Sequence, residues 1–553
     1  MRATHASVRL RHRPCAGRAL RVLLVALPLL LPAAACSSGA PDRADTTADS
    51  GPDARMSDAS GDAAWEVRGS DLPDSGPDAP VTDTAPDRAA ADGGPLFQPL
   101  ACDDQAGTAM TLAQKAEAMD HAAVTWHLPE GQDLLFSVHL KEDLQTFDKV
   151  GMSDNVGTWT AFYAASQSFR YAATRDPEAL ANLRRVIRGE HDMLEITGVP
   201  GLFTRVIVNP ALPGFPSADQ LAVWYPDCDL SVKHCKKFIE VTEGPYKGLW
   251  FKNDVSKDEY AAHMFSMAVA WELVDDPEVR ERVADIVTQV GDHLIDHALN
   301  ITDVDGKVTT FGAMNAAGFD DWPGFDAVLS LSWLRLATTV GGDKYRDFYE
   351  NCLLQKSGKK ACIPGEEPKP YTVYIKDMVG LDLGCKTNWN NHNMAQLSMY
   401  HLVRNEDDPE IKALYRDALA HQLWAPTDPY PMRDQQKTLY TFFYLVNRDP
   451  SDPWPSVPAH DAICTMKRFR ETKNHFPVDT TTQYPTVCLD RNDEPMTDVV
   501  IPIDMQAMDN CLWLGNPYKP EVDPGDPKIV ESPEDYLTAY WMGRYFGFIT
   551  PEM

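Results

Sequence analysis

The chain has 553 residues, of which 44% are hydrophobic and 24% are charged, which is ordinary for a globular protein and ample for a sizeable core. Lysine and arginine number 51 against 81 for aspartate and glutamate, giving a formal net charge of -30. This balance argues against nucleic acid and anionic membrane surfaces as partners, because both require a basic face. No stretch reaches the roughly 18 apolar residues of a membrane-spanning helix.

Residues 1–35 have the pattern of an export signal. They contain six arginines, no acidic residue, a short apolar run over 20–31 and small residues before Cys36. The cysteine after three alanines resembles the lipobox of bacterial lipoproteins, which implies that Cys36 is lipidated and becomes the mature N-terminus. Ser37 implies, by the same resemblance, anchoring to the bacterial outer membrane, on its periplasmic or cell-surface face. An ordinary secretory signal with an unrelated cysteine is the alternative.

Residues 36–95 differ in composition from the rest of the chain. Aspartate recurs every three to five residues over much of this segment, among Ala, Pro, Gly, Ser and Thr, and Trp65 is the single aromatic residue. Such a segment cannot bury enough apolar surface to offset its chain entropy, so we expect a disordered, extended tether. A calcium-binding repeat is the alternative, but the spacing is irregular and no loop has a closing glutamate.

Residues 96–553 are expected to form one helical domain. Three junctions repeat one design, in which an apolar helix is followed by Asp-Pro-Glu and a charged amphipathic helix; they begin at Asp176, Asp276 and Asp408. Aspartate caps the second helix, proline suits its first position and glutamate complements its dipole. Gly341-Gly342-Asp343 predicts a fourth junction, with Asp343 capping the next helix. Short loops of this kind join antiparallel neighbours.

The two helices of each pair differ in polarity. The second helices have one apolar stripe, as over 279–294, whereas the first are apolar almost all round, as over 264–271 and 328–337. A helix that is apolar on every side is buried on every side. This alternation predicts two concentric rings: an all-α fold of the α/α-toroid class, with six hairpins, long loops and small β-hairpins. An open solenoid is the alternative, but its repeats of roughly 34 to 45 residues are much shorter than the spacing between these junctions.

Nine cysteines follow Cys36, and in an exported protein they should be oxidised where geometry allows. Three pairs each bracket a loop and are the preferred bridges: Cys228–Cys235, Cys352–Cys362 and Cys464–Cys488. Sequence does not determine connectivity, and because nine is odd at least one thiol stays free or pairs elsewhere. Zinc binding by the first pair with His234 is the alternative, although the spacing matches no common zinc motif. We expect neither a metal nor a cofactor.

Two polar clusters occur where a loop leads into a buried helix. Asp154 and Trp159 belong to a segment that resembles the opening of sugar-processing toroid domains, where an acidic and an aromatic residue lie at the rim of the cleft. In the second cluster, Glu259 and His263 share one helix face, and Asp258 stands beside them. A carboxylate and an imidazole on a mostly buried helix need a partner or a chemical role. Helix caps with core side chains are the alternative for both clusters, and metal binding is a further one for the second.

A third cluster, Asn388-Trp389-Asn390-Asn391-His392-Asn393, lies at the expected start of another buried helix. A helix start offers free N–H groups, amides can orient a carboxylate, and an indole can stack on a sugar ring. The element Asn390-Asn391-His392 resembles one found in alginate and heparin-type polysaccharide lyases of the toroid fold. That resemblance implies that an amide engages the uronate carboxylate and that His392 helps to abstract the C5 proton. The alternative is that the amides only cap the helix.

As a whole, the chain resembles surface lipoproteins that bear an (α/α)6-toroid domain active on glycans, which implies a carbohydrate ligand. The leading hypothesis is glycoside hydrolysis with Asp154 and either Glu259 or Asp258 as the acid/base pair. The second is uronate elimination by His392, and the third is a noncatalytic glycan-binding or scaffold module. The residues expected to bind substrate are Trp159, Trp389, Asn390, Asn391, His263 and Arg544. We expect no nucleic acid partner and no membrane contact except through the lipid.

Overall fold

The computed structural model describes residues 109–317, 322–358, 360–361, 363, 367–378, 384–424, 430–449 and 456–553. All of them belong to one compact unit, Ser60–Met553. The expected signal peptide, Cys36 and the expected tether lie outside these residues. Within them, no helix is both long enough and apolar enough to cross a membrane.

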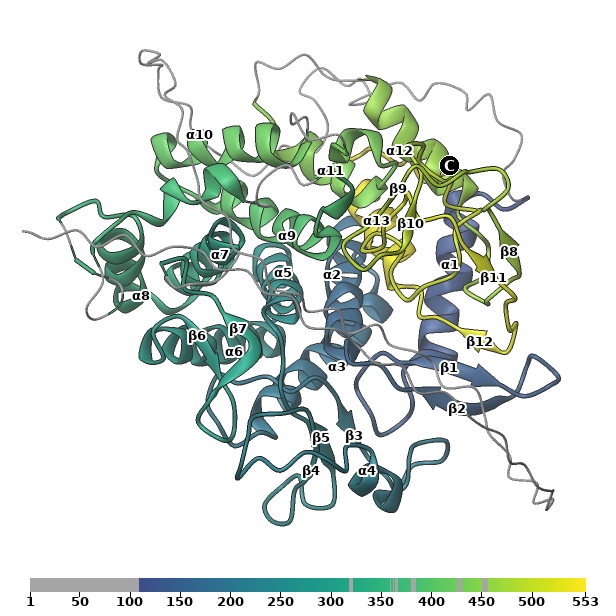
Figure 1. Cartoon of the computed structure of the whole chain (residues 1–553), viewed down its shortest axis with the longest axis horizontal. Helices are drawn as coiled ribbons and strands as arrows, with labels where there is room; N and C mark the ends of the chain where they lie inside the picture. Colours follow the sequence, from purple (N-terminus) through teal and green to yellow (C-terminus); the bar gives the residue numbers. More distant parts are fainter. Residues whose placement is uncertain are drawn as a thin grey trace, which may run out of the picture. The chain divides into compact units, whose positions relative to one another are not determined.

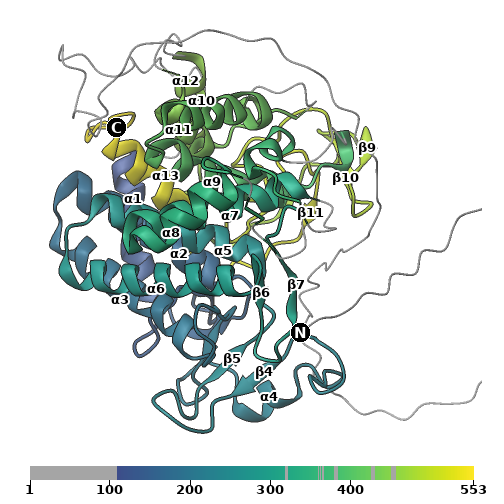
Figure 2. The same cartoon turned by 90° about the vertical axis from the view of Figure 1, so that its left-hand side faces the viewer.

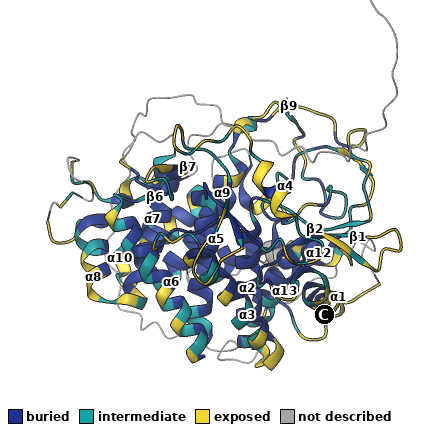
Figure 3. Ribbon diagram, turned by 90° about the horizontal axis from the view of Figure 1, so that it is seen from below, coloured by how far each residue is buried: buried dark blue, intermediate teal, exposed yellow. Residues whose placement is uncertain are grey.

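In the described residues, six helices form an inner ring and are buried almost all round (Figures 1 and 3). They are α2 (Val156–Thr174), α5 (Lys257–Leu273), α7 (Pro323–Gly341), α9 (Trp389–Asn405), α11 (Thr438–Asn447) and α13 (Glu534–Tyr545). Each packs against the next in this order, and α13 packs against α2, which closes the ring. The prediction of helices buried on every side is thereby confirmed.

Each inner helix has an outer partner. The outer helices are α1 (Leu112–Ala122), α3 (Pro177–Glu195), α6 (Pro277–Asp296), α8 (Asp343–Asp347), α10 (Pro409–Ala418) and α12 (Ser456–Arg468). Short π-helical segments extend three of them: η1 (Ala123–His127), η2 (Phe348–Leu353) and η6 (Leu419–Trp424). The sixth hairpin joins opposite ends of the domain, because α1 packs against α13 and the Leu112 backbone N–H donates to the Met553 carbonyl at 2.7 Å. The fold is an α/α toroid of six hairpins, as predicted.

The Asp-Pro-Glu junctions act as predicted. The side chains of Asp176, Asp276 and Asp408 accept hydrogen bonds from backbone N–H groups in the first turns of α3, α6 and α10. The fourth junction differs from the prediction. Gly342 takes the cap position with a φ of 83°, so Asp343 is the first residue of α8 and does not cap it.

The long connections between hairpins carry five small antiparallel sheets and the short helix α4 (Ala218–Val223) in the described residues. The sheets have the orders β12–β1–β2, β3–β5–β4, β6–β7, β10–β9 and β11–β8. Their strands are β1 (Ser137–Leu140), β2 (Phe147–Gly151), β3 (Ile207–Val208), β4 (Phe238–Glu240), β5 (Trp250–Lys252), β6 (Asn300–Thr302), β7 (Val308–Ala313), β8 (Val478–Asp479), β9 (Cys488–Leu489), β10 (Pro495–Met496), β11 (Val522–Asp523) and β12 (Ile529–Val530). In the first sheet, Val138 pairs with both Val150 and Val530, so β1 lies between early and late parts of the chain.

The connections differ in length on the two sides of the ring. Short turns lead from inner to outer helices, as at 175–176 and 274–276, whereas long segments such as 196–256 and 297–322 lead back to the next inner helix. Because the paired helices are antiparallel, the inner helices begin on one rim, where the long connections lie (Figure 2). The three polar clusters expected at helix starts therefore share one side of the toroid.

The bridge Cys228–Cys235 is present, with a sulfur–sulfur distance of 1.99 Å. Cys488 bonds to Cys385 and not to Cys464, which corrects the predicted third pair. The reason is placement: Cys464 is on the outer helix α12, whereas Cys488 on β9 lies beside η5 (Gly384–Lys386), which carries Cys385. Cys352 and Cys464 each take part in a disulfide. Cys362, the predicted partner of Cys352, lies outside the described residues. Cys511 is a buried free thiol.

Candidate functional site at the inner-helix rim

The buried guanidinium of Arg205, 4% exposed, lies among the predicted acidic residues. Its Nη1 donates to Glu259 Oε2 at 3.0 Å, and its Nε donates to the backbone oxygen of Asp254 at 2.5 Å. Its backbone contacts Gly157 at the start of α2 and Lys252 on β5. Burial lowers the pKa of Arg205, but Glu259 and Asp154 outweigh that effect and raise it. Arg205 thus connects the starts of α2 and α5, and no sequence motif indicated it.

Asp154, just before α2, is held by two lysines. Lys252 Nζ donates to one carboxylate oxygen, and Lys236 Nζ donates to the other at 3.1 Å. Lys252 Nζ also donates to the hydroxyl of Tyr225. Burial raises the pKa of Asp154, but Lys252, Arg205 and Lys236 together lower it below its ordinary value. Asp154 is therefore ionised at neutral pH.

Glu259, in the first turn of α5, is fully buried. Its Oε2 accepts from Arg205 and from the Ser256 backbone N–H at 3.3 Å, whereas Oε1 has no hydrogen-bond partner among the described residues. Burial raises the pKa of Glu259 to about 8; Arg205 opposes the shift, and Asp258 adds to it. Burial thus favours the protonated form of Glu259, whereas the lysines favour the ionised form of Asp154.

Asp258 and Asn390 join two of the predicted clusters at the surface. Asn390 Nδ2 donates to Asp258 Oδ2 at 2.9 Å, which links the starts of α5 and α9. The Ser256 hydroxyl donates to Asp258 Oδ1 and lies 3.4 Å from Glu259 Oε2. Asn390 is exposed and Asp258 half-buried, whereas Asp154 is 8% and Glu259 0% exposed. Of the three predicted catalytic carboxylates, Asp258 is the one that faces solvent.

Both predicted histidines are interior residues. Nδ1 of His263 lies 2.7 Å from Glu190 Oε2, and its ring stacks on Phe203 at 4.0 Å. His392 is fully buried; burial lowers its pKa to about 4, and Lys437 adds to the shift. Both histidines are 0% exposed, so neither touches a sugar or a water next to it in this arrangement, and the expected roles of His263 and His392 are corrected.

The predicted tryptophans and Asn391 are also enclosed. Trp389 is 7% exposed, with its ring 5.6 Å from those of Tyr430 and Tyr518. Trp159 is buried in the hydrophobic core, and Asn391 is buried in the first turn of α9, which Asn388 caps. None of the three can stack on or orient a sugar in this arrangement, which corrects those predictions.

Arg544 lies far from the rim. It belongs to the last turn of α13, ten residues after the helix start, or about 15 Å along the axis. Its Nη1 donates to the hydroxyl of Tyr540 at 2.9 Å. The expectation that Arg544 reaches a central site is corrected, because its helix ends on the opposite side of the ring.

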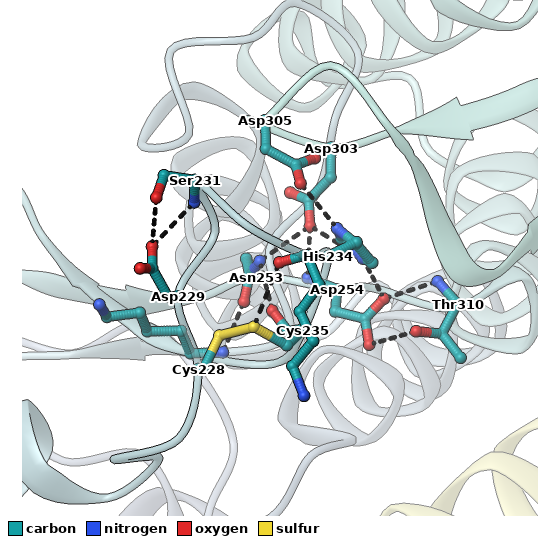
Figure 4. Close-up of a disulfide and its surroundings, with 12 residues drawn as sticks. Cys228, Asp229, Ser231, His234, Cys235, Asn253, Asp254, Asp303, Asp305 and Thr310 are labelled. Carbon is teal, nitrogen blue, oxygen red and sulfur yellow. Dashed lines mark hydrogen bonds and ion pairs between the residues drawn. A yellow bond between two sulfur atoms is a disulfide. The ribbon is translucent and has the colours of Figure 1, made fainter.

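A second group of titratable side chains lies between the Cys228–Cys235 loop, the β6–β7 hairpin and the residues that precede α5. His234 Nε2 lies 2.8 Å from Asp254 Oδ1, and His234 Nδ1 lies 3.2 Å from Asp305 Oδ2 (Figure 4). Asp303 Oδ2 is 3.7 Å from His234 Nε2. Burial lowers the pKa of His234, but these carboxylates raise it above its ordinary value. We call His234, Asp254, Asp303 and Asp305 the His234 cluster; it joins the Cys228–Cys235 loop to the β6–β7 hairpin and to the approach to α5.

His234, Asp254 and Asp303 are of the types that ligate metal ions, and so are His191, Glu195 and Asp285 on the outer helices α3 and α6. In the His234 cluster, backbone N–H groups already donate to Asp254 and Asp303, from Thr310 at 2.7 Å and from Asp254 at 2.9 Å. Both ring nitrogens of His234 also lie within hydrogen-bond distance of a carboxylate oxygen, so protein groups already occupy these would-be ligand atoms. The zinc alternative loses two ligands, because Cys228 and Cys235 form a disulfide.

No family model matches the chain, and no curated protein matches it. Solved structures are similar to it. They include a GH76 α-mannanase of Bacteroides thetaiotaomicron (9% identity, 79% of this chain and 96% of that chain, TM-score 0.34) and the endoglucanase CelQ of Clostridium thermocellum in complex with cellotriose (12%, 78% and 70%, 0.36). An unsaturated glucuronyl hydrolase mutant of Streptococcus agalactiae is another (10%, 81% and 96%, 0.30). At these identities and TM-scores the likenesses assign neither a family nor an activity to the chain.

Proposed function

We propose that the chain hydrolyses glycosidic bonds at the rim formed by the starts of α2, α5 and α9. The observation that carries the proposal is a pair of carboxyl groups, both within electrostatic reach of Arg205, whose pKa values are displaced in opposite directions. The pKa of Asp154 is lowered by Lys252, Arg205 and Lys236 against the effect of burial, and that of Glu259 is raised by burial. Separated pKa values of this kind are the usual signature of an acid and a base in one site.

Asp258 is the carboxyl group that a bound sugar reaches, and Asn390 beside it is a hydrogen-bond donor for sugar hydroxyls. The Ser256 hydroxyl donates to Asp258 Oδ1 and lies 3.4 Å from Glu259 Oε2, so it holds the Asp258 carboxyl group in place beside Glu259. In the reaction, Asp258 protonates the glycosidic oxygen as the bond to the anomeric carbon breaks. Asp154, 8% exposed, accepts a proton from the water that attacks this carbon; it then releases that proton to solvent, and Asp258 takes up another.

The two other hypotheses find less support. Elimination from a uronate needs a base in contact with the sugar, and His392 is fully buried. A noncatalytic binding module predicts a cleft lined by Trp and amides, with no close, buried carboxylate pair. The indoles of Trp159 and Trp389 are buried, and Asp154 and Glu259 are two buried carboxyl groups that both raise the pKa of Arg205.

The cellular location belongs to the same proposal. We infer that Cys36 carries the lipid, that residues 37–95 form the tether and that the chain acts outside the cytoplasm, at the bacterial outer membrane. The disulfides Cys228–Cys235 and Cys385–Cys488 support export, because disulfides persist in oxidising compartments.

The test is a release assay on the purified chain with a panel of neutral and acidic polysaccharides. New reducing ends without the absorbance of a conjugated C4=C5 double bond indicate hydrolysis. We expect Asp258→Asn to lower kcat by roughly 100-fold or more, the usual contribution of a general acid. Asp143→Asn is the control, because Asp143 is an exposed carboxylate in the β1–β2 turn. Wild-type activity in Asp258→Asn, or products that carry the double bond, would overturn the proposal.

A further inference from the structure

Trp224 is exposed beside the proposed active site. Its side chain is 44% exposed, whereas Trp159, Trp250 and Trp389 at the rim are each 8% exposed or less. Leaving a large indole in water forgoes the stabilisation that burying it would bring, which is roughly 25 cal/mol per Å2 of apolar surface. Single exposed apolar residues are common on protein surfaces, so the case for Trp224 depends on its contacts with the proposed site.

A short chain of contacts connects Trp224 to Asp154. The rings of Trp224 and Phe238 have centroids 5.5 Å apart, and Phe238 is paired with Lys252 across strands β4 and β5. Lys252 Nζ lies 5.8 Å from the Phe238 ring and donates to Asp154. Tyr225, the next residue after Trp224, receives a hydrogen bond from the same ammonium group. Trp224 is thus two side chains away from a proposed catalytic carboxylate.

The backbone around Trp224 is constrained on both sides. A capping box between Ser217 and Gln220 starts α4, which ends directly before Trp224. The disulfide Cys228–Cys235 closes the loop that follows, and His234 in that loop is held by the His234 cluster (Figure 4). These constraints reduce the conformational freedom that a bound ligand would have to remove.

We propose that Trp224 is a stacking platform for one sugar ring of a neutral polysaccharide whose scissile bond lies at Asp154 and Asp258; this inference rests on the proposed function. The apolar face of a pyranose ring matches the flat indole, and half-buried Tyr225 offers a hydroxyl to the sugar hydroxyls at the edge of the ring. A stacked sugar ring needs no charge for this contact, so the proposed ligand is a neutral glycan.

The test measures binding separately from cleavage. Trp224→Ala and Trp224→Phe are made in the full chain and in Asp258→Asn, in which cleavage is impaired. The control is Phe311→Ala, because Phe311 is an equally exposed aromatic residue on β7, outside the Trp224 contacts. The probes are tri- to hexasaccharides of glucose, mannose, galactose and xylose, and binding is followed by calorimetry and by tryptophan fluorescence.

We expect Trp224→Ala to weaken binding about tenfold or more and to raise KM with little change in kcat, while Trp224→Phe retains much of the affinity and Phe311→Ala binds as the wild type. Equal melting temperatures for all variants exclude unfolding as the cause. If Trp224→Ala binds and cleaves like the wild type, the platform is wrong and the proposed hydrolase stands. Binding that depends on Trp224 without any cleavage supports the platform and overturns the hydrolase. If no probe binds the wild type, both are overturned.

Discussion

Replacing Glu259 with glutamine tests whether this buried carboxyl group is neutral. The side chain is fully buried, and burial raises its pKa from 4.5 to about 8 against the effect of Arg205. In the unfolded chain the same group loses its proton near pH 4.5, so between about pH 5 and pH 8 the native state holds a proton that the unfolded state has released. The stability of the wild type therefore falls as pH rises through this range and levels off above the folded pKa.

The magnitude follows from the size of the shift. Each pH unit between the two pKa values changes the free energy of unfolding by about 1.4 kcal/mol per proton. The free energy of unfolding of the wild type should therefore fall by about 4 kcal/mol between pH 5 and pH 8 on account of Glu259. Glutamine has nearly the same shape, cannot ionise, and can accept the bonds from Arg205 and Ser256 through its amide oxygen. We expect Glu259→Gln to match the wild type near pH 5 and to become progressively more stable than the wild type toward pH 8.

The assay is the midpoint of urea unfolding at pH 5, 6, 7 and 8 for the wild type, Glu259→Gln and the control Glu117→Gln, an exposed carboxylate on α1. The infrared difference between the wild type and Glu259→Gln at neutral pH should show the carbonyl band of a protonated carboxylic acid. The reasoning is refuted if Glu259→Gln is less stable than the wild type by a constant amount at every pH. That result would mean that Glu259 is ionised and forms a buried ion pair with Arg205, whose disruption typically costs about 3–5 kcal/mol.

Three further predictions concern the loops and the anchor. Against the effect of burial, the carboxylates of the His234 cluster raise the pKa of His234, so their stabilisation is fully present at low pH and is lost as pH rises through that pKa. His234→Gln should therefore lower the melting temperature more at acidic than at alkaline pH, and an equal effect at both would contradict the interaction between His234 and these carboxylates. Cys385 and Cys488 are separated by 103 residues, so replacing both with serine should cost about 4 to 5 kcal/mol in unfolding experiments, and an unchanged unfolding midpoint would contradict this expectation. Cys36→Ser should move the chain from the membrane pellet to the soluble fraction, and persistence in the pellet through alkaline washing would place the anchor elsewhere.

The helical framework could be predicted from the sequence because it depends on interactions between near neighbours. A cap, a proline and a glutamate within three residues determine where α3, α6 and α10 begin, as Asp176, Asp276 and Asp408 show. The distribution of apolar residues around each helix predicted which helices are enclosed by others. Helices that must be covered on every side pack in the interior, and here they form the inner ring. The helix starts and the burial of each helix could both be predicted because each depends on residues within a few helical turns of one another.

The site could be predicted only in part. The polar clusters were expected at helix starts, and they lie on one rim because the connections alternate between short and long. The contacts within the site join residues far apart in sequence. Asn390 meets Asp258 across 132 positions, and Lys252 meets Asp154 across 98 positions. Arg205 and Lys252 are single charged residues without a local motif, so no pattern indicated them.

Sequence by itself determined the helical type of the main elements, the starts of α3, α6 and α10 and the rim on which chemistry could occur, because helix caps and apolar periodicity are local properties. Only the tertiary structure decided which side chains face solvent. Asn390, Asn391 and His392 are consecutive, yet the first is exposed and the other two are buried, because successive residues of a helix point about 100° apart and α9 is enclosed by its neighbours. Cys488 bonds to Cys385 for the same kind of reason: a disulfide needs two Cα atoms within about 7 Å, and only the folded chain brings β9 beside η5.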